Sequence, residues 1–245
     1  MTDEGEVAPR ERALALLNRE PRDGTLGVAD ILRRLCRAAT LDLDLAGATV
    51  TLMPDLGSHT VAAASGPRAR HTEEMQFDVG EGPTREAYQA RQPVLVPNLE
   101  SVVARWPGFT PTALAAGMSA TFSLPLNVGA ARLGALTLYW HRPARPAETD
   151  LRIALVFADL ATELLIDSCL ADPSESLEPA LDSALETQGH IFQAQGMVMV
   201  DLGVRLPEAL ARMRAQAFAS GQSLAALAAE IIDGTAIVRK DQKLR

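Results

Sequence analysis

The sequence predicts an α+β domain with a mostly antiparallel sheet, followed by an all-α module of three helices. Up to residue 140, segments that alternate apolar and polar residues are interspersed with segments of helical periodicity. A polar stretch that contains Pro173 interrupts the pattern over residues 171–176. Beyond it, only helical periodicity occurs. We therefore expect two domains, and 245 residues are enough to form a core in each.

The first elements are helices and a hairpin. Residues 1–24 are polar and predict a tail that carries one short helix through Ala13 to Leu17. In residues 27–40, apolar side chains recur every three or four positions, which predicts an amphipathic helix. The alternating segments 48–53 and 59–64 flank a turn with Pro and Gly, which is typical of a β-hairpin.

The rest of the first domain alternates strands with helices. Residues 75–79 predict a third strand, and residues 84–92 predict a helix that begins after Gly82–Pro83. The later elements are a short buried strand over 94–96, a broken helix over 106–118, two strands over 120–128 and 132–140, and a closing helix over 148–170.

Three helices are predicted after the break, over 181–202, from Pro207 to Gly221, and from Ser223, a good N-cap, to Gly234. With short turns between them they predict a compact helical module. The residues expected on its buried faces are Leu181, Leu185, Gln188, Phe192 and Met199 in the first helix, Leu206, Leu210, Met213 and Ala217 in the second, and Leu224, Leu227, Ala228, Ile231 and Ile232 in the third.

The charge is unevenly distributed. The chain has 23 basic and 31 acidic residues, a formal charge of −8, which argues against charge-driven nucleic-acid binding over the whole surface. Residues 181–245 contain seven basic and seven acidic side chains, so the whole deficit lies in residues 1–180. This asymmetry is expected when an acidic sensor carries a module that approaches a polyanion.

Residue types for catalysis or metal binding are sparse. Cys36 and Cys169 lie in helix-like segments, and the four histidines share no spacing that places two on one face. No catalytic or nucleotide-binding motif is present, and Gly80–Pro83 predicts a strand-to-helix turn rather than a phosphate loop. We expect no metal, no cofactor and no enzymatic activity.

No stretch of about 18 apolar residues occurs, as a membrane-spanning helix requires. The first 22 residues are charged and lack the pattern of a secretory signal. We expect a cytoplasmic protein without a membrane partner.

Gly196 is unusual because glycine in the middle of a helix costs about 1 kcal/mol relative to alanine. Two interpretations remain open. With Ala194 it would let a phosphate or a base edge approach the backbone, while Gln193 and Gln195 donate and accept hydrogen bonds. Alternatively, Gly196 permits close packing of two helices.

The stretch 193–199, followed by Leu202–Val204, Glu208–Ala209, Arg212–Arg214 and Leu224–Ala228, resembles the ANTAR domain. This family is the three-helix RNA-binding module of bacterial transcription antiterminators, and the resemblance covers about 187–233. One residue departs from the pattern: Gln195 replaces the lysine that the family usually has, which reduces the attraction for phosphate.

The first domain resembles a GAF domain over about 25–170, on the segments 80–83, 91–99, 105–109, 123–126 and 133–139. The family has a small-molecule pocket, or a remnant of one, on one face of a six-stranded antiparallel sheet. The resemblance implies a lining of Phe77, Trp106, Phe109, Met118, Phe122 and Tyr139. Alternatively, these side chains fill the core. The cysteines do not lie where a chromophore or thiol chemistry would need them.

Together the resemblances imply a transcription antiterminator that binds paired stem-loops in nascent mRNA leaders. Arg212 and Arg214 would contact phosphates, Gln193, Gln195 and Ser223 would contact loop bases or sugars, and Ala194 and Gly196 would permit close approach. The GAF domain would sense a small molecule or set the geometry of a homodimer, through helices 27–40 and 148–170.

Two alternatives remain. In one, the helical module contacts DNA or a protein rather than RNA; in the other, the chain is a ligand-binding or enzymatic GAF protein with a structural tail. The implied boundaries are a tail over 1–24, the GAF domain over 25–170, a linker over 171–180, the ANTAR domain over 181–238 and a C-terminal tail over 239–245.

Overall fold

A computed structural model describes residues 8–19, 27–53, 59–145, 147–170 and 179–238. The side chains of residues 169, 170 and 179–188 are outside this description, as are the hairpin turn 54–58, most of the predicted linker and the C-terminal tail. The chain forms two compact units: an α+β unit of Met1–Gln76 and Glu81–Leu181, and a helical unit of Asp182–Arg245, with which Phe77–Gly80 are grouped.

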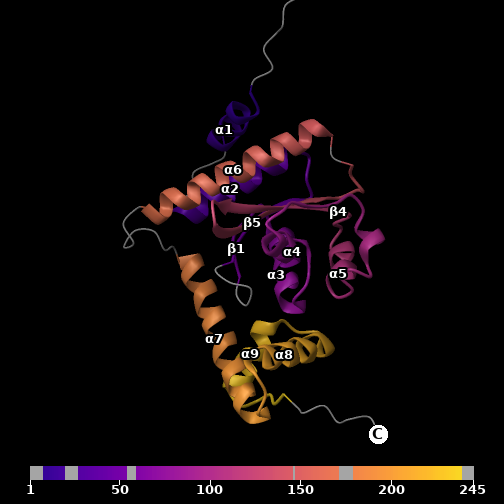
Figure 1. Ribbon diagram of the computed structural model, residues 1–245, viewed down its shortest axis with the longest axis vertical. Helices are drawn as coiled ribbons and strands as arrows, with labels where there is room; N and C mark the ends of the chain where they lie inside the picture. The colour runs from indigo at the N-terminus through magenta and orange to yellow at the C-terminus, as the bar shows by residue number, and fades with distance from the viewer. Residues whose placement is uncertain (1–7, 20–26, 54–58, 146, 171–178, 239–245) are drawn as a thin grey trace, which may run out of the picture. The chain divides into compact units, whose positions relative to one another are not determined.

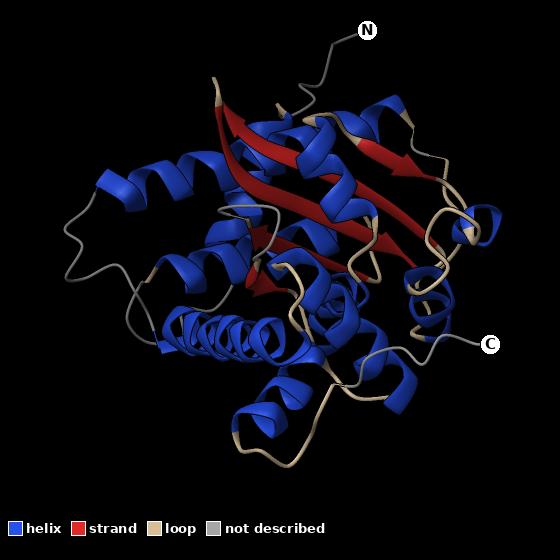
Figure 2. Cartoon of the chain, turned by 60° about the horizontal axis from the view of Figure 1, so that its bottom comes forward, coloured by secondary structure: helices blue, strands red, loops and turns tan. Residues whose placement is uncertain are grey.

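The α+β unit contains one sheet, drawn in red in Figure 2. Its strands are all antiparallel and follow the order β2-β1-β5-β4-β3. The predicted hairpin is confirmed, since β1 and β2 pair antiparallel. In the described residues the sheet has five strands rather than the six typical of the resembled family. The strands are β1 (Gly47–Leu52), β2 (Thr60–Ala64), β3 (Val94–Val96), β4 (Ala120–Val128) and β5 (Ala131–Trp140).

One face of the sheet is covered by α2 (Val28–Asp42) and α6 (Glu148–Leu170) (Figure 1). The predicted N-terminal helix is present as α1 (Pro9–Arg19), which packs on both of them. Its Ala13 and Leu17 are buried in the same core as the sheet residues. The buried Arg34 donates a hydrogen bond of 2.6 Å to the carbonyl oxygen of Leu17. The short helix is therefore part of this core.

The other side of the sheet carries α3 (Pro67–Val79), α4 (Pro83–Ala90) and α5 (Phe109–Ala115) (Figure 1). The helix predicted after Gly82 is confirmed, with Pro83 in its first turn. The helix predicted over 106–118 is shorter, because it begins only after Pro107–Gly108. A 3₁₀ turn at Leu99–Val102, η1, was not predicted.

The strand predicted over 75–79 is wrong, because these residues form the end of α3. The buried residues Ala69, Thr72, Glu73 and Gln76 recur at spacings of three and one, as on one face of a helix. Three of the four are polar. A hydrophobicity pattern therefore misses this helix, and only the apolar residues at its end resembled a strand.

The helical unit consists of α7 (Pro179–Leu202), α8 (Leu206–Ser220) and α9 (Leu224–Ile232), as predicted. Ser223 is the N-cap of α9, and its Oγ accepts a hydrogen bond of 3.2 Å from the backbone NH of Ala226. The predicted buried residues of α8 and α9 are confirmed except for Leu206, which is 42% exposed, and Ile232, which is half-buried.

The predicted buried face of α7 is wrong at Phe192, which is 43% exposed. The side chains of Leu181, Leu185 and Gln188 lie outside the described residues, and Met199 is half-buried. The observed face is rotated by about one residue around the helix, and a helix advances about 100° per residue. It consists of Ile191, Ala194, Val198 and Leu202.

Candidate functional site

The α3-side face of the sheet carries an unusual number of hydroxyl groups. Thr49, Thr137 and Ser123 are cross-strand neighbours in one row of the sheet, and all three are fully buried. Thr121 and Tyr139 form the adjacent pair. Buried polar groups of this kind need hydrogen-bond partners.

Glu73 on α3 is the centre of these hydrogen bonds. Its Oε2 accepts from the Tyr139 hydroxyl at 2.7 Å, from Thr49 Oγ1 at 3.1 Å and from Gln76 Nε2 at 3.1 Å. Burial raises the pKa of Glu73, and burial beside Glu73 raises the pKa of Tyr139 well above its ordinary value. Tyr139 therefore remains a neutral donor.

Gln76 extends the network to α4. Its Oε1 accepts from the backbone NH of Thr84 at 2.9 Å, and its Nε2 lies 2.8 Å from Thr84 Oγ1. Thr84 Oγ1 forms a hydrogen bond of 2.8 Å with Thr137 Oγ1. Thr137 Oγ1 forms a second hydrogen bond, of 2.9 Å, with Ser123 Oγ. Gly82 is required here, because a Cβ atom on it would lie 2.3 Å from Gln76 Oε1. The chain's own side chains thus occupy the space against this part of the sheet.

The six residues expected to line a pocket do not all lie together. Tyr139 belongs to the polar network. Phe122 lies on the other face, where it contacts Trp140 at 4.4 Å between ring centroids and alternates with Ser123. Trp106 and Phe109 pack edge to face at 6.2 Å, and Met118 is buried after α5. Phe77 lies in the last turn of α3. Burial of the aromatic residues on the sheet and around α5 is what the core-filling alternative expects.

Cys36 is fully buried in α2, which raises the pKa of its thiol to about 12. A thiol with so high a pKa is a poor nucleophile. In the residues described, no three His, Cys, Asp or Glu side chains form a group that could hold a metal ion.

In the helical unit, the four consecutive residues expected to contact RNA have different environments. Gln193 is exposed, whereas Ala194 is fully buried and Gln195 is only 4% exposed. The Gln195 Nε2 donates a hydrogen bond of 2.7 Å to the carbonyl oxygen of Leu206. Ala194 and Gln195 therefore lie in the interior, and Gln195 connects α7 to the start of α8.

Gly196 is half-buried, and a Cβ atom placed on it would meet nothing within 4 Å. Close packing between two helices therefore does not explain this glycine within the part of the chain that the structure describes. The open space beside the backbone is what the other interpretation, close approach of a ligand, requires.

The two arginines of α8 lie on different sides of the helix. Arg212 Nη2 lies 2.9 Å and its Nε 3.3 Å from Glu208 Oε1, one turn earlier. Arg214 follows two residues later, about 200° around the helix axis. One phosphate therefore cannot contact both arginines through the same helix face. The Ser223 side chain is engaged as the N-cap of α9.

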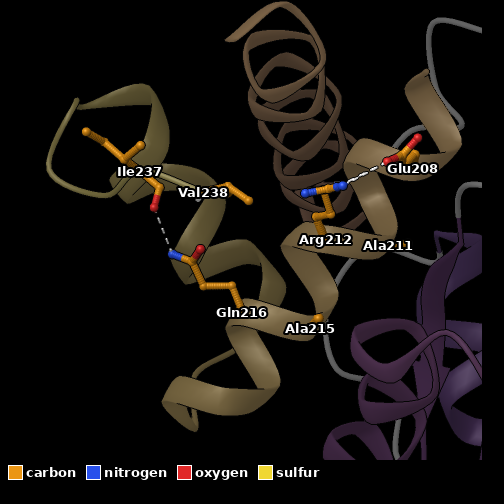
Figure 3. Close-up of a pocket in the computed structure, with 7 residues that line it drawn as sticks. All are labelled: Glu208, Ala211, Arg212, Ala215, Gln216, Ile237 and Val238. Atoms are coloured by element: carbon orange, nitrogen blue, oxygen red, sulfur yellow. Dashed lines mark hydrogen bonds and ion pairs between the residues drawn. The ribbon is translucent and has the colours of Figure 1, made fainter. Parts of the chain in front are cut away.

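A groove of about 770 Å³ runs along α8 beside the segment that follows α9 (Figure 3). Of its residues, only Arg212 was predicted from the sequence as a site residue. We call it the α8 groove; its lining consists of Glu208, Ala211, Arg212, Ala215, Gln216, Ile237 and Val238.

Phe218 was also missed. Its side chain is 63% exposed near the end of α8. A large aromatic side chain so exposed is a candidate for ligand contact, because unpaired bases stack on aromatic rings. The helical periodicity could have predicted this exposure, because the buried stripe of the helix includes Ala217 and not its neighbour Phe218.

Family models match both parts of the chain: one for the GAF domain matches residues 25–165, and one for the ANTAR domain matches residues 180–232. A comparison with curated proteins gives no match. No helix of the described residues has the length and hydrophobicity needed to cross a membrane.

Solved structures of GAF domains are similar to the α+β unit. The GAF domain of a phosphoenolpyruvate-protein phosphotransferase from Coxiella burnetii is 13% identical, with a TM-score of 0.52, and the match covers 66% of this chain and 93% of that chain. Its counterpart from Acinetobacter is 10% identical, with a TM-score of 0.49 and the same coverage of both chains. At such identities the Coxiella structure supports the fold alone.

Proposed function

Because the chain belongs to the GAF domain family and carries a C-terminal ANTAR domain, we propose that it is an RNA-binding transcription antiterminator. ANTAR is an RNA-binding antitermination domain and GAF is a sensor domain, and both are regulatory rather than catalytic. In this proposal, the ANTAR domain binds paired stem-loops in a nascent mRNA leader. Binding keeps a terminator from forming, so that transcription continues. Such a protein acts in the cytoplasm, where the leader is made.

The single observation that supports this function best is the open backbone at Gly196 in α7. Gln193, one turn earlier, is exposed on the same helix, and nothing lies within 4 Å of a Cβ placed at Gly196. Unstacked loop bases expose donors and acceptors that an amide can read, whereas the deep groove of A-form RNA is inaccessible. In the proposal, Gln193 contacts the loop and Gly196 permits its close approach.

The charges of the module limit how it binds. Residues 181–245 are formally neutral, and Arg212 is paired with Glu208. We therefore expect few phosphate contacts and a shallow dependence of affinity on salt. Ser223 acts through its position at the start of α9. Ala194 and Gln195 support the surface from the interior.

The GAF domain is proposed to set the geometry of a homodimer, which would present two ANTAR domains to two stem-loops. The predicted surfaces are α2 and α6, which carry exposed Leu41 and Leu155. Sensing of a small molecule remains part of the proposal. Its site would require displacement of the hydrogen bonds among Glu73, Gln76 and Tyr139, because these side chains fill the α3-side face.

The test is selection by the full-length chain from a pool of RNAs that carry two hairpins with randomised loops. The proposal predicts enrichment of shared loop sequences and loss of binding when one hairpin is deleted. Recovery of loops without any common sequence would contradict it. The double variant Arg212→Ala/Arg214→Ala should bind the enriched RNA at least tenfold more weakly, whereas normal binding would favour a structural role for the helical unit.

A further inference from the structure

We propose that the α8 groove receives one unstacked base of the bound RNA, and that it does not hold a phosphate. The inference rests on the proposed function and adds a base-binding site to it. The groove combines an apolar floor with the Arg212–Glu208 ion pair and the side-chain amide of Gln216. Each of these features favours a nucleobase.

The floor of the groove is formed by small apolar side chains. Ala211 and Ala215 are one turn apart on α8, and their methyl groups leave space above the helix (Figure 3). Ile237 and Val238 provide an aliphatic wall. The volume of about 770 Å³ lies within the range of small-molecule sites. Apolar contact on a ring face is indifferent to sequence, so it supplies affinity for any base.

The charged residues of the groove disfavour phosphate. Arg212 Nη2 and Nε both lie close to Glu208 Oε1, so the guanidinium is already neutralised at the groove. A phosphate that approached Arg212 would meet the Glu208 carboxylate. A base edge offers both donors and acceptors, and it can therefore use an arginine and a carboxylate side by side.

Gln216 supplies an amide at the other wall. Its Nε2 lies 3.4 Å from the carbonyl oxygen of Ile237, which orients the side chain across the groove (Figure 3). With its nitrogen directed to Ile237, the amide presents Oε1 as an acceptor for an amino or imino group of a base. The groove therefore offers donors from Arg212 and acceptors from Glu208 and Gln216.

The test combines a variant that fills the groove with removal of single bases from the RNA. In the RNA enriched by the full-length chain, each loop nucleotide is replaced in turn by an abasic one. We expect one abasic position to weaken binding about tenfold, as for a stacked base. Ala215→Trp should weaken binding of the intact RNA similarly and should be insensitive to that abasic position.

Ala229→Trp is the matched control, because Ala229 is exposed on α9 and does not line the groove. This variant should bind as the wild type does. If Ala215→Trp does not fold, Gln216→Ala replaces it, with the same loss of sensitivity to the abasic position expected. Wild-type affinity and unchanged abasic sensitivity in the groove variant would overturn the inference and leave RNA binding intact.

A second modification separates base from phosphate. A neutral methylphosphonate at the position that responds to base removal should leave binding within about twofold. If binding depends on that phosphate instead, the groove holds a phosphate and the inference is wrong. If the full-length chain enriches no RNA at all, the proposed function fails, which is distinct from either result.

Discussion

The side-chain amide of Gln195 in α7 donates a hydrogen bond of 2.7 Å to the carbonyl oxygen of Leu206, the first residue of α8. Gln195 is only 4% exposed, and its Oε1 is buried without a hydrogen-bond partner among the described residues. A residue that the sequence places in the RNA-binding signature thus connects two helices from the inside. Its effect on RNA binding is expected to pass through the fold of the domain.

Replacement of Gln195 should therefore lower mainly the stability, whereas replacement of Gln193 should weaken mainly RNA binding. Gln195→Ala should lower the free energy of unfolding by about 1–3 kcal/mol, since it removes a buried hydrogen bond and leaves a space. Gln193→Ala should change stability by less than about 0.5 kcal/mol, because Gln193 is exposed, but should weaken RNA binding. Urea unfolding and RNA titration of the same variants measure both effects. Equal stability of the two variants would contradict this assignment.

The buried carboxyl of Glu73 should make stability depend on pH. Burial raises the pKa of Glu73 in the folded state, so the folded chain holds this proton to a higher pH than the unfolded chain. The free energy of unfolding should then decrease as the pH rises from about 4, the ordinary value, through the raised pKa. Glu73→Gln should lack this decrease, because an amide does not titrate.

The measurement is urea unfolding of both proteins at a series of pH values. Glu74→Gln is the matched control, since Glu74 is the exposed neighbour on α3 and should leave the slope as in the wild type. A Glu73→Gln protein with an unchanged slope would show that another group causes the pH dependence.

Gly134 in β5 should tolerate no side chain. A Cβ atom at this position would lie 1.9 Å from the carbonyl oxygen of Thr51 on the paired strand β1. Gly134→Ala should cost about 1–3 kcal/mol or more, because the strands must move apart. Gly66→Ala, where a Cβ meets nothing within 4 Å, should be close to neutral. Thermal unfolding compares the two, and similar midpoints would contradict the close approach of β1 and β5.

Phe218 should contribute to RNA binding without contributing to stability. Its ring is 63% exposed, so Phe218→Ala should change the free energy of unfolding by less than about 0.5 kcal/mol. A stacked base contributes about 1–3 kcal/mol, so the affinity for the enriched RNA should fall about tenfold. Val128→Ala removes an exposed apolar side chain of β4, in the α+β unit, but no ring, and it should bind RNA normally. If the two variants bind alike, stacking on Phe218 is excluded.

Hydrophobic periodicity was sufficient to predict nearly all elements, because most of their buried residues are apolar. It predicted β4 and β5 within a residue, and it predicted the three helices of the ANTAR domain. It failed at α3, whose buried face includes Thr72, Glu73 and Gln76. These side chains are buried only because the sheet presents matching hydroxyls, and a partner so distant in sequence leaves no local signal.

The candidate site was less predictable for a similar reason. The signature 193–196 indicated a segment of α7, but which of its side chains are exposed depends on how α7 packs, and the buried face shifted by about one residue from the prediction. The α8 groove requires Ile237 and Val238, which follow α9 without a motif. Phe122 was assigned to the same pocket as Tyr139. It lies on the opposite face of the sheet, because it alternates along β4 with Ser123, which is on the Tyr139 face.

Competition between two nucleic acids distinguishes recognition of RNA loops by the ANTAR domain from general binding to nucleic acid. The full-length chain is titrated with a two-hairpin RNA from the selection, in the presence of duplex DNA of the same sequence, at several salt concentrations. We predict that the RNA binds at least tenfold more tightly. With about two phosphate contacts, log K should fall with log salt at a slope of about −1.4. Equal affinity for RNA and duplex DNA would show that the ANTAR domain does not recognise RNA loops.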